Sequence, residues 1–267
     1  MDKTTIITNR KVRLNKPILV VGLPGIGHVG KLVANQLIKE FKGKRFATMY
    51  SPHFPHQVVM RRDGTIRLVS NRFYVLKPKS AGSDIVILTG DVQAVTPEGQ
   101  YETNSKIVEY FAKELKGSFV YTIGGYSVGA PIAATPKVFG NVTRKEIAEQ
   151  FKGQGILFGK SSGMIWGSAG LILAFAKQDK VSGICLMGET GFLEVDPAAA
   201  KSVLTVLAKK LGLKIDMTNI DEKINETARA LSALEQKVAL GLQQEQQNAP
   251  QAPQPSKGPS EQPSYIR

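Results

Sequence analysis

The sequence predicts an α/β domain in which helices flank a mostly parallel sheet. Residues 17–30, PILVVGLPGIGHVG, lead from five apolar or β-branched residues into a glycine-rich turn and then into a helical pattern. Further apolar strands are expected at residues 85–88 and 181–187, and each precedes a segment with helical spacing. Because strand and helix alternate along the chain, we expect a doubly wound arrangement.

The first third of the chain adds an antiparallel insert to this pattern. After a helix that begins near residue 26, a second strand is predicted at residues 45–50, RFATMY. The β-rich section around residues 57–76 contains Asp63 and Gly64, which together are a hairpin turn signal. The strand at residues 85–88 then ends at Gly90 and Asp91.

The remainder of the domain continues the alternation. Asp196 and Pro197 supply an N-cap and a first-turn proline for a helix that stops at Gly212. The run from Met164 to Ala176 is too short to span a bilayer and is predicted to be a buried helix. The other predicted elements are a helix over residues 99–115, a strand over 118–123 and a strand near 137–142.

Four segments are expected in all. They are an N-terminal extension (1–16), the α/β domain (17–217), a C-terminal amphipathic helix (218–244) and a disordered Gln/Pro-rich tail (245–267). The apolar stripe of the C-terminal helix needs a partner, which is either the domain itself or another subunit. This stripe consists of Ile220, Ile224, Leu231, Leu234, Val238 and Leu242.

The positive charge is concentrated in one part of the chain. Residues 1–90 contain 16 Lys or Arg and 4 Asp or Glu, a net charge of +12 out of +13 for the whole sequence. Such a region attracts acidic partners. No recognised nucleic-acid motif accompanies it, so a solvated face or a dock for an acidic protein is favoured over nucleic acid.

The cysteine content and the N-terminal sequence both bear on the cellular compartment of the protein. The single cysteine, Cys185, excludes an intramolecular disulfide and lies in an apolar strand, as expected for a buried thiol. The first 16 residues have no apolar core of a signal peptide. We therefore expect a cytoplasmic protein without a membrane partner.

The glycine-rich turn raises the alternative of a nucleotide-binding enzyme, a ligase or phosphorylase relative. Gly25, Gly27 and Gly30 match GxGxxG between strand and helix, and Asp91 stands at the end of a later strand where such sheets place ligands. However, the second strand ends in Thr48, Met49 and Tyr50, without the acid that would bind a ribose. No cofactor is predicted; the glycine loop and Asp91 remain the alternative site.

A second motif suggests a hydrolase. Gly125, Ser127 and Gly129 match the GxSxG elbow after a strand. The proline- and alanine-rich residues 130–136 do not continue as the helix that the elbow requires, and all three histidines precede the serine. His53 and His56 lack a third ligand for a metal. We therefore predict neither catalytic residues nor a metal site.

The ordered sequence blocks resemble the archaeal proteasome assembly chaperone family over roughly residues 15–240. The blocks are GLPGIGHVGKLVANQLI, ILTGDVQ, TIGGYSVG, SSGMIWGSAGLILAFAK, ICLMGETG and DPAAAKSVLTVLAKKLGLKID. This resemblance implies a Rossmann-like α/β fold, related in shape to nucleoside phosphorylases and of the phosphorylase/hydrolase-like class. It also implies a non-enzymatic chaperone or adaptor that self-associates and binds the proteasome core particle or its α subunits.

The resemblance also directs attention to the C-terminal tip. Family members can dock through a C-terminal hydrophobic residue, tyrosine, any-residue triplet whose carboxylate pairs with a lysine of an α subunit. Here the last residues are Tyr265, Ile266 and Arg267, so tyrosine stands third from the end. These three residues are the predicted partner-binding site.

Overall fold

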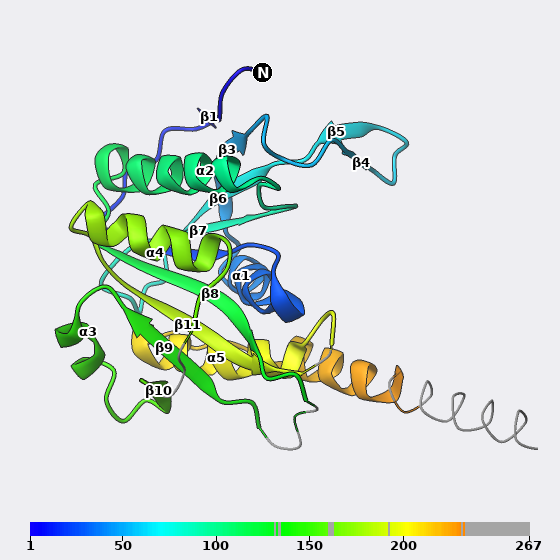
Figure 1. The fold of residues 1–267 in the computed structure, drawn as a ribbon, viewed down its shortest axis with the longest axis vertical. Coiled ribbons are helices and arrows are strands. Elements are labelled where there is room, and N and C mark those ends of the chain that lie inside the picture. The colour runs from blue at the N-terminus through cyan, green and yellow to red at the C-terminus, as the bar shows by residue number, and fades with distance from the viewer. Residues whose placement is uncertain (131, 133–134, 160–162, 192, 231, 233–267) are drawn as a thin grey trace, which may run out of the picture. The chain divides into compact units, whose positions relative to one another are not determined.

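The computed structural model describes residues 1–130, 132, 135–159, 163–191, 193–230 and 232. The chain divides into two compact units, Met1–Ile224 and Asn225–Arg267. The first unit contains the sheet and the helices that pack on it (Figure 1). In the described part of the chain, no helix is long and apolar enough to cross a membrane.

Within the described residues, nine strands form one sheet and two more form a separate hairpin. The bounds are β1 (Thr5–Thr8), β2 (Ile18–Gly22), β3 (Lys44–Tyr50), β4 (Val58–Met60), β5 (Ile66–Leu68), β6 (Asn71–Leu76), β7 (Ile85–Gly90), β8 (Phe119–Ser127), β9 (Val138–Val142), β10 (Ile156–Phe158) and β11 (Ser182–Thr190). The order in the large sheet is β1-β3-β6-β7-β2-β8-β11-β9-β10, and β4 pairs with β5.

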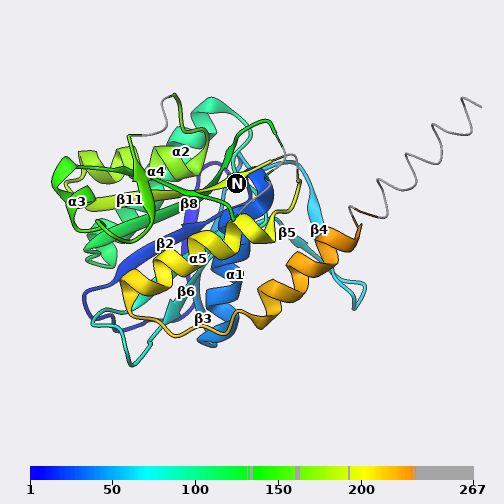
Figure 2. The same cartoon turned by 90° about the horizontal axis from the view of Figure 1, so that it is seen from below.

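Helices cover both faces of this sheet. They are α1 (Val29–Glu40), α2 (Pro97–Glu109), α3 (Lys145–Glu149), α4 (Ser168–Gln178) and α5 (Pro197–Leu211), with a 3₁₀ turn at Ile26–His28 and a π turn at Tyr110–Glu114. Helices α1 and α5 pack on one face, and α2 and α4 pack on the other (Figures 1 and 2). The domain is therefore a three-layer α/β structure.

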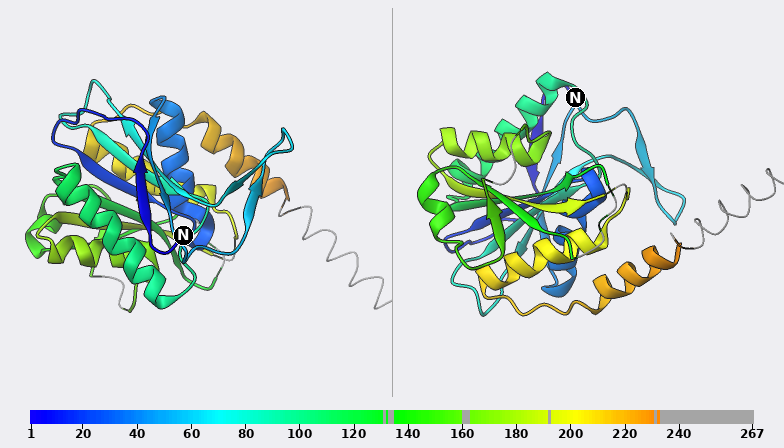
Figure 3. Two further views of the ribbon diagram at one scale, coloured as in Figure 1. Left: turned by 90° about the horizontal axis from the view of Figure 1, so that it is seen from above. Right: turned by 60° about the horizontal axis from the view of Figure 1, so that its bottom comes forward.

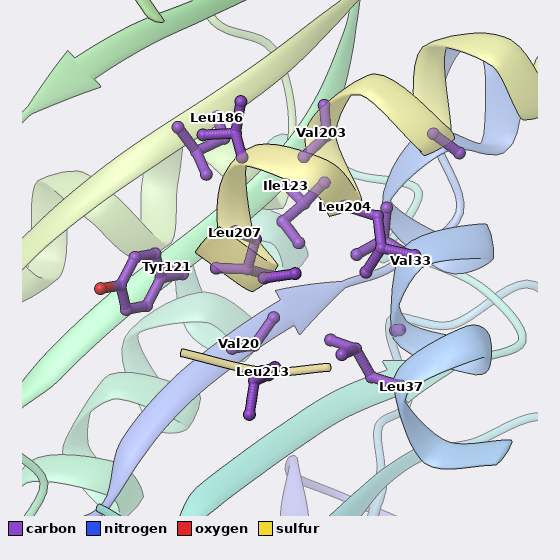
Figure 4. Packing of buried hydrophobic residues seen from close by; sticks show 14 of the residues in the cluster. Val20, Val33, Leu37, Tyr121, Ile123, Leu186, Val203, Leu204, Leu207 and Leu213 are labelled. Carbon is purple, nitrogen blue, oxygen red and sulfur yellow. The ribbon is translucent and has the colours of Figure 1, made fainter. Parts of the chain in front are cut away.

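The strand pattern explains why both faces are covered. Successive side chains of β2 alternate between the faces, so Val20 packs towards α1 and α5 while Leu19 and Val21 pack towards α2 and α4. Figure 4 shows the first of these cores, where Val33 and Leu37 of α1 approach the apolar side of α5. A strand buried on both sides has to be apolar throughout, as β2 is.

The ends of α5 agree with the sequence prediction. The Asp196 carboxylate accepts a hydrogen bond from the Ala199 amide at 2.9 Å, and Pro197 occupies the first turn. Gly212 ends the helix in the left-handed region, at a φ of 63°. Both signals act over a few residues, which is why the sequence alone locates this helix.

The expectation of a mostly parallel sheet needs correction. The pairs β2–β7, β2–β8, β8–β11 and β9–β10 are parallel, whereas β1–β3, β3–β6, β6–β7 and β9–β11 are antiparallel. The chain returns from β8 to the sheet through β9, which lies beyond β11 and runs against it. The expected N-terminal extension, residues 1–16, also contains a strand of the sheet: β1 pairs with β3 at the edge of the sheet (Figure 3).

The predicted buried helix between Met164 and Ala176 is only partly correct. Helix α4 begins at Ser168, and the preceding loop exposes 78% of Met164 and 79% of Trp166. Gly167, at a φ of 73°, separates this loop from the helix. Apolar composition alone did not distinguish the exposed loop from the buried helix that follows it.

The first residues of the predicted C-terminal helix are described. Residues 218–230 are helical, Ile220 is buried, and Ile224 packs against the core that α1 and α5 share. The first two positions of the apolar stripe therefore contact the domain itself. The other stripe residues, Leu231, Leu234, Val238 and Leu242, lie outside the described residues.

Candidate functional site

A cavity of about 220 Å³ opens at the carboxyl ends of β2 and β8. The chain leaves these neighbouring strands in opposite directions. From β2 it passes through α1 to β3, on the β7 side of the sheet, whereas from β8 it passes to β9, which lies beyond β11 on the other side. Open α/β sheets bind ligands at such a switch point, since the divergent connections leave a space there. The cavity thus lies where this fold favours a site.

The lining of the cavity is largely apolar. Ile123 and Met187 come from the strands, whereas Met164 and Trp166 come from the exposed loop before α4. None of the described lining residues is charged. They are Val21, Leu23, Gly25, Ile26, Gly30, Gln93, Ile123, Gly124, Gly125, Tyr126, Ser127, Met164, Ile165, Trp166, Ser168, Ala169 and Met187. This lining suits an apolar group and offers no side-chain cation to a phosphate.

Gln93 ties together two elements of the cavity wall. Its side-chain Nε2 donates to the Pro24 carbonyl at 2.5 Å, and its Oε1 accepts from the Ser168 backbone amide at 2.9 Å. The amide at the start of α4 is therefore already occupied by protein. Gln93 follows Asp91 by two residues in the ILTGDVQ block, and no local pattern in the sequence signals this bridge, because its two partners lie about 70 residues away on either side.

The glycines of the loop are required for close packing. A Cβ on Gly22 would lie 2.1 Å from the Gly30 carbonyl oxygen, and one on Gly30 would lie 2.6 Å from the Ile123 carbonyl oxygen. Gly27 has a φ of 60°, and its carbonyl accepts from the Asp196 amide at 2.8 Å. Strand β2, α1 and β8 can approach one another this closely only because side chains are missing there.

Asp196 packs beside Gly27, the second glycine of the GxGxxG match, where the pyrophosphate of a dinucleotide would need space. A Cβ on Gly27 would lie 3.0 Å from Thr190 Oγ1 and 3.2 Å from the Asp196 Cβ. The Asp196 carboxylate is itself bonded by the Thr190 hydroxyl at 2.7 Å. A carboxylate packed beside the second glycine opposes a pyrophosphate by charge as well as by volume. These contacts argue against the nucleotide alternative for Gly25, Gly27 and Gly30.

Asp91 is held by two arginines rather than left free for a ligand. Arg67 of β5 binds it at 2.5 and 3.0 Å, Arg72 of β6 binds it at 2.5 Å, and the Ser70 amide donates at 3.0 Å. Burial by itself raises the pKa of Asp91, but the Arg67 hydrogen bonds, the Arg72 charge and the Ser70 amide outweigh it. The net result is a pKa below the ordinary value of 3.8.

Ser127 lacks the surroundings of a nucleophile. Ser127 is the last residue of β8, and residues 128–130 after it are not helical, so the strand-to-helix turn of an elbow is not formed there. Within the described residues, no hydrogen bond joins Ser127 to a histidine, and His53 pairs with Glu102 at 2.8 Å. Cys185 is fully buried, and burial raises the pKa of its thiol to about 11.

The metal site and the C-terminal tip are the two remaining points of the sequence analysis, and the described residues bear on each only in part. Among the residues that the structure describes, no three His, Cys, Asp or Glu side chains gather to hold a metal ion. Tyr265, Ile266 and Arg267, the predicted partner-binding tip, lie outside the described residues. That tip stays a prediction.

Trp166 provides a direct optical test of the exposed rim. It is the single tryptophan of the sequence, and 79% of its surface is accessible. We expect the free protein to emit near the wavelength of tryptophan in water and to be quenched strongly by acrylamide, because solvent reaches the ring. Steady-state fluorescence checks this, with Trp166→Phe as the blank. A blue-shifted, quencher-resistant emission would contradict the exposed position.

Comparisons with known proteins agree on one family. The model of the PAC2 family matches residues 19–235. An uncharacterized protein of Methanocaldococcus jannaschii is 39% identical over 255 residues, which are 94% of this chain and 95% of that protein.

Solved structures give the same result. PbaB of Pyrococcus furiosus, described as an archaeal proteasome activator, is 38% identical with a TM-score of 0.83, over 88% of this chain and 100% of that chain. PbaA of the same organism, described as an archaeal homolog of proteasome-assembly chaperone, shares the fold at 23% identity. Its TM-score is 0.73 over 92% of this chain and 97% of that chain.

Proposed function

This chain belongs to the PAC2 family, and on that premise we propose that it is a non-enzymatic proteasome assembly chaperone or activator. Its partner is the proteasome core particle or the α subunits of that particle. The observation that carries the proposal is the similarity to PbaB, a proteasome activator, along the whole length of that chain. The resemblance found in the sequence blocks is thereby confirmed at the level of the family.

The described surface supports a binding protein rather than an enzyme. The cavity at the strand ends has an uncharged lining, Asp91 is neutralised by arginines, and Ser127 has no histidine partner among the described residues. General acid–base or nucleophilic chemistry needs a titratable group held within reach of a substrate. An apolar cavity with an exposed tryptophan at its rim is instead suited to contact with another protein.

Three further features belong to the same proposal. The fold is Rossmann-like, which the parallel core β7-β2-β8-β11 with helices on both faces supports. The protein self-associates. In the sequence, the apolar stripe of the C-terminal helix continues at heptad spacing after Ile220 and Ile224, and these later apolar residues need a partner. It works in the cytoplasm, where a lone free thiol such as Cys185 stays reduced.

We further propose that the C-terminal tip makes the contact with the core particle. Tyr265 and Ile266 supply two bulky apolar groups, and the chain carboxylate after Arg267 supplies a negative charge. A carboxylate next to apolar side chains fits a pocket that presents a lysine. The Gln/Pro-rich residues 245–264 would act as the tether that carries the tip to this pocket.

Removing the tip is the experiment that tests this function. We expect full-length protein to bind the core particle and a chain ending at Ser264 to bind at least tenfold more weakly, because the anchoring side chains and carboxylate are gone. Pull-down and surface plasmon resonance with purified core particle and free α subunits measure the difference. A chain ending at Gln244 shows whether the tether contributes beyond the tip.

The matched control keeps length and charge. In Tyr265→Phe the ring remains, so binding should stay within about threefold of the full-length protein. Unchanged binding by the chain ending at Ser264 would move the interface to the folded domain. Failure of the full-length protein to bind either the core particle or the α subunits would contradict the proposed function itself.

A further inference from the structure

The hairpin formed by β4 and β5 exposes an apolar face. Val58 pairs with Leu68, and Met60 pairs with Ile66, whereas Val59 and Arg67 form the pair between them. Because side chains alternate along a strand, the two outer pairs lie on one face of the ribbon and the middle pair on the other. We call Val58, Met60, Ile66 and Leu68 the hairpin face.

The hairpin face is unusually accessible for its composition. Met60 is 84% exposed and Ile66 is 65% exposed, and Val58 and Leu68 are also exposed. The hairpin extends from the sheet at the end of β3 and β6 (Figures 1 and 3). At its base, Val58 and Leu68 line a cavity of about 400 Å³ together with Phe54. A clustered apolar surface of this kind marks an interaction site.

The opposite face of the hairpin is fixed to the domain. Val59 packs against the core on the α2 side, and Arg67 binds the Asp91 carboxylate. The turn is closed by the Arg61 amide, which donates to the Thr65 carbonyl at 2.8 Å. The ribbon is therefore held in one position before any partner binds, which lowers the entropy cost of binding.

The positive charge at the tip of the hairpin indicates what kind of partner would bind the hairpin face. Arg61 and Arg62 are exposed at the tip of the hairpin beside the hairpin face, within the third of the chain whose net charge is +12. A second copy would bring the same positive surface against itself, which Coulomb repulsion disfavours. The hairpin face is aliphatic and has no aromatic ring for stacking bases, which disfavours nucleic acid. An acidic protein surface with apolar side chains matches both properties.

We propose that the hairpin face and the two tip arginines form a docking surface for an acidic, partly apolar patch of the partner protein. This inference rests on the proposed function, because the partner is the core particle or its α subunits. The hairpin is then a second contact, separate in the chain from the C-terminal tip. It gives the folded domain a role in orienting the partner, whereas the tip supplies an anchor on a tether.

Two double variants test the docking surface in the full chain. We expect Met60→Ser with Ile66→Ser to weaken binding to purified core particle about tenfold, because the apolar contact is lost. Arg61→Gln with Arg62→Gln should weaken binding about threefold and reduce its dependence on salt, because two charges no longer attract the acidic patch. Surface plasmon resonance at low and high salt measures both effects.

Matched controls separate these effects from general changes. Ile7→Ser with Val95→Ser removes two exposed apolar side chains, one from β1 and one from the segment before α2, and Lys145→Gln with Lys209→Gln removes two exposed charges from α3 and α5. Both controls should bind like the unmodified chain. Because every substituted side chain is exposed or partly exposed, we expect all four variants to keep the urea midpoint of the parent.

Each outcome decides the inference. Tight binding by the unmodified chain and equally tight binding by both hairpin variants would overturn the docking surface while leaving the proposed function intact. No binding by the unmodified chain would contradict the proposed function, and the docking surface with it. A smaller oligomer of the Met60→Ser and Ile66→Ser variant in sedimentation would assign the hairpin face to a second copy and overturn the acidic partner.

Discussion

Gly22→Ala is expected to destabilise the protein by about 3 kcal/mol, or to prevent folding altogether. The new Cβ would lie 2.1 Å from the Gly30 carbonyl oxygen and 2.6 Å from the Ala34 Cβ. Both atoms belong to α1, which is packed against β2 and against α5 and cannot move without opening the core. Urea unfolding followed by circular dichroism measures the loss.

Gly25→Ala is the matched control from the same loop. The nearest atom to its Cβ would be Gln93 Nε2 at 3.6 Å, and the backbone at Gly25 is extended, with a φ of −170°. We expect a change within about 0.5 kcal/mol. Equal tolerance of both substitutions would show that the glycines do not serve packing. A thermal shift of the parent chain with ATP or NAD would then revive the nucleotide alternative.

Asp91→Ala is expected to destabilise the protein by about 2–3 kcal/mol at pH 7. The substitution leaves Arg67 and Arg72, whose side chains are 23% and 19% exposed, without their anion, and it removes the acceptor of the Ser70 amide. Because Arg67 belongs to β5, the hairpin should also loosen. Urea unfolding gives the free energy, and hydrogen exchange of the Arg61 amide reports the hairpin.

The pH dependence gives an independent check on Asp91. Its pKa is lower in the folded protein than its ordinary value of 3.8, so its stabilising contribution is complete above that value. The contribution is lost as the pH falls from about 4 through the folded-state pKa, because the carboxyl becomes protonated. The stability difference between the parent and Asp91→Ala should therefore shrink as the pH is lowered from about 4. A difference that stays constant over this range would exclude the ion pairs as its cause.

Several elements of this protein could be predicted from local sequence. The apolar run at β2, the glycine turn after it and the capped helix α5 all appear where the sequence indicated. The hairpin turn at Asp63 and Gly64 was predicted as well, because the turn is closed by neighbouring residues such as Thr65. Each of these features depends on interactions within a few residues, and a short stretch of sequence is therefore enough to specify it.

The order and direction of the strands follow from long-range packing and could not be read from local patterns. Apolar alternation makes a segment suitable for a sheet but does not select its neighbour, so β9 could not be assigned to the far side of β11. The partners of Asp91 come from β5 and β6, about 20 residues away, and the hairpin face and Trp166 remain exposed because no other described segment covers them. Sequence patterns record which residues can be buried, whereas long-range packing determines which of them are.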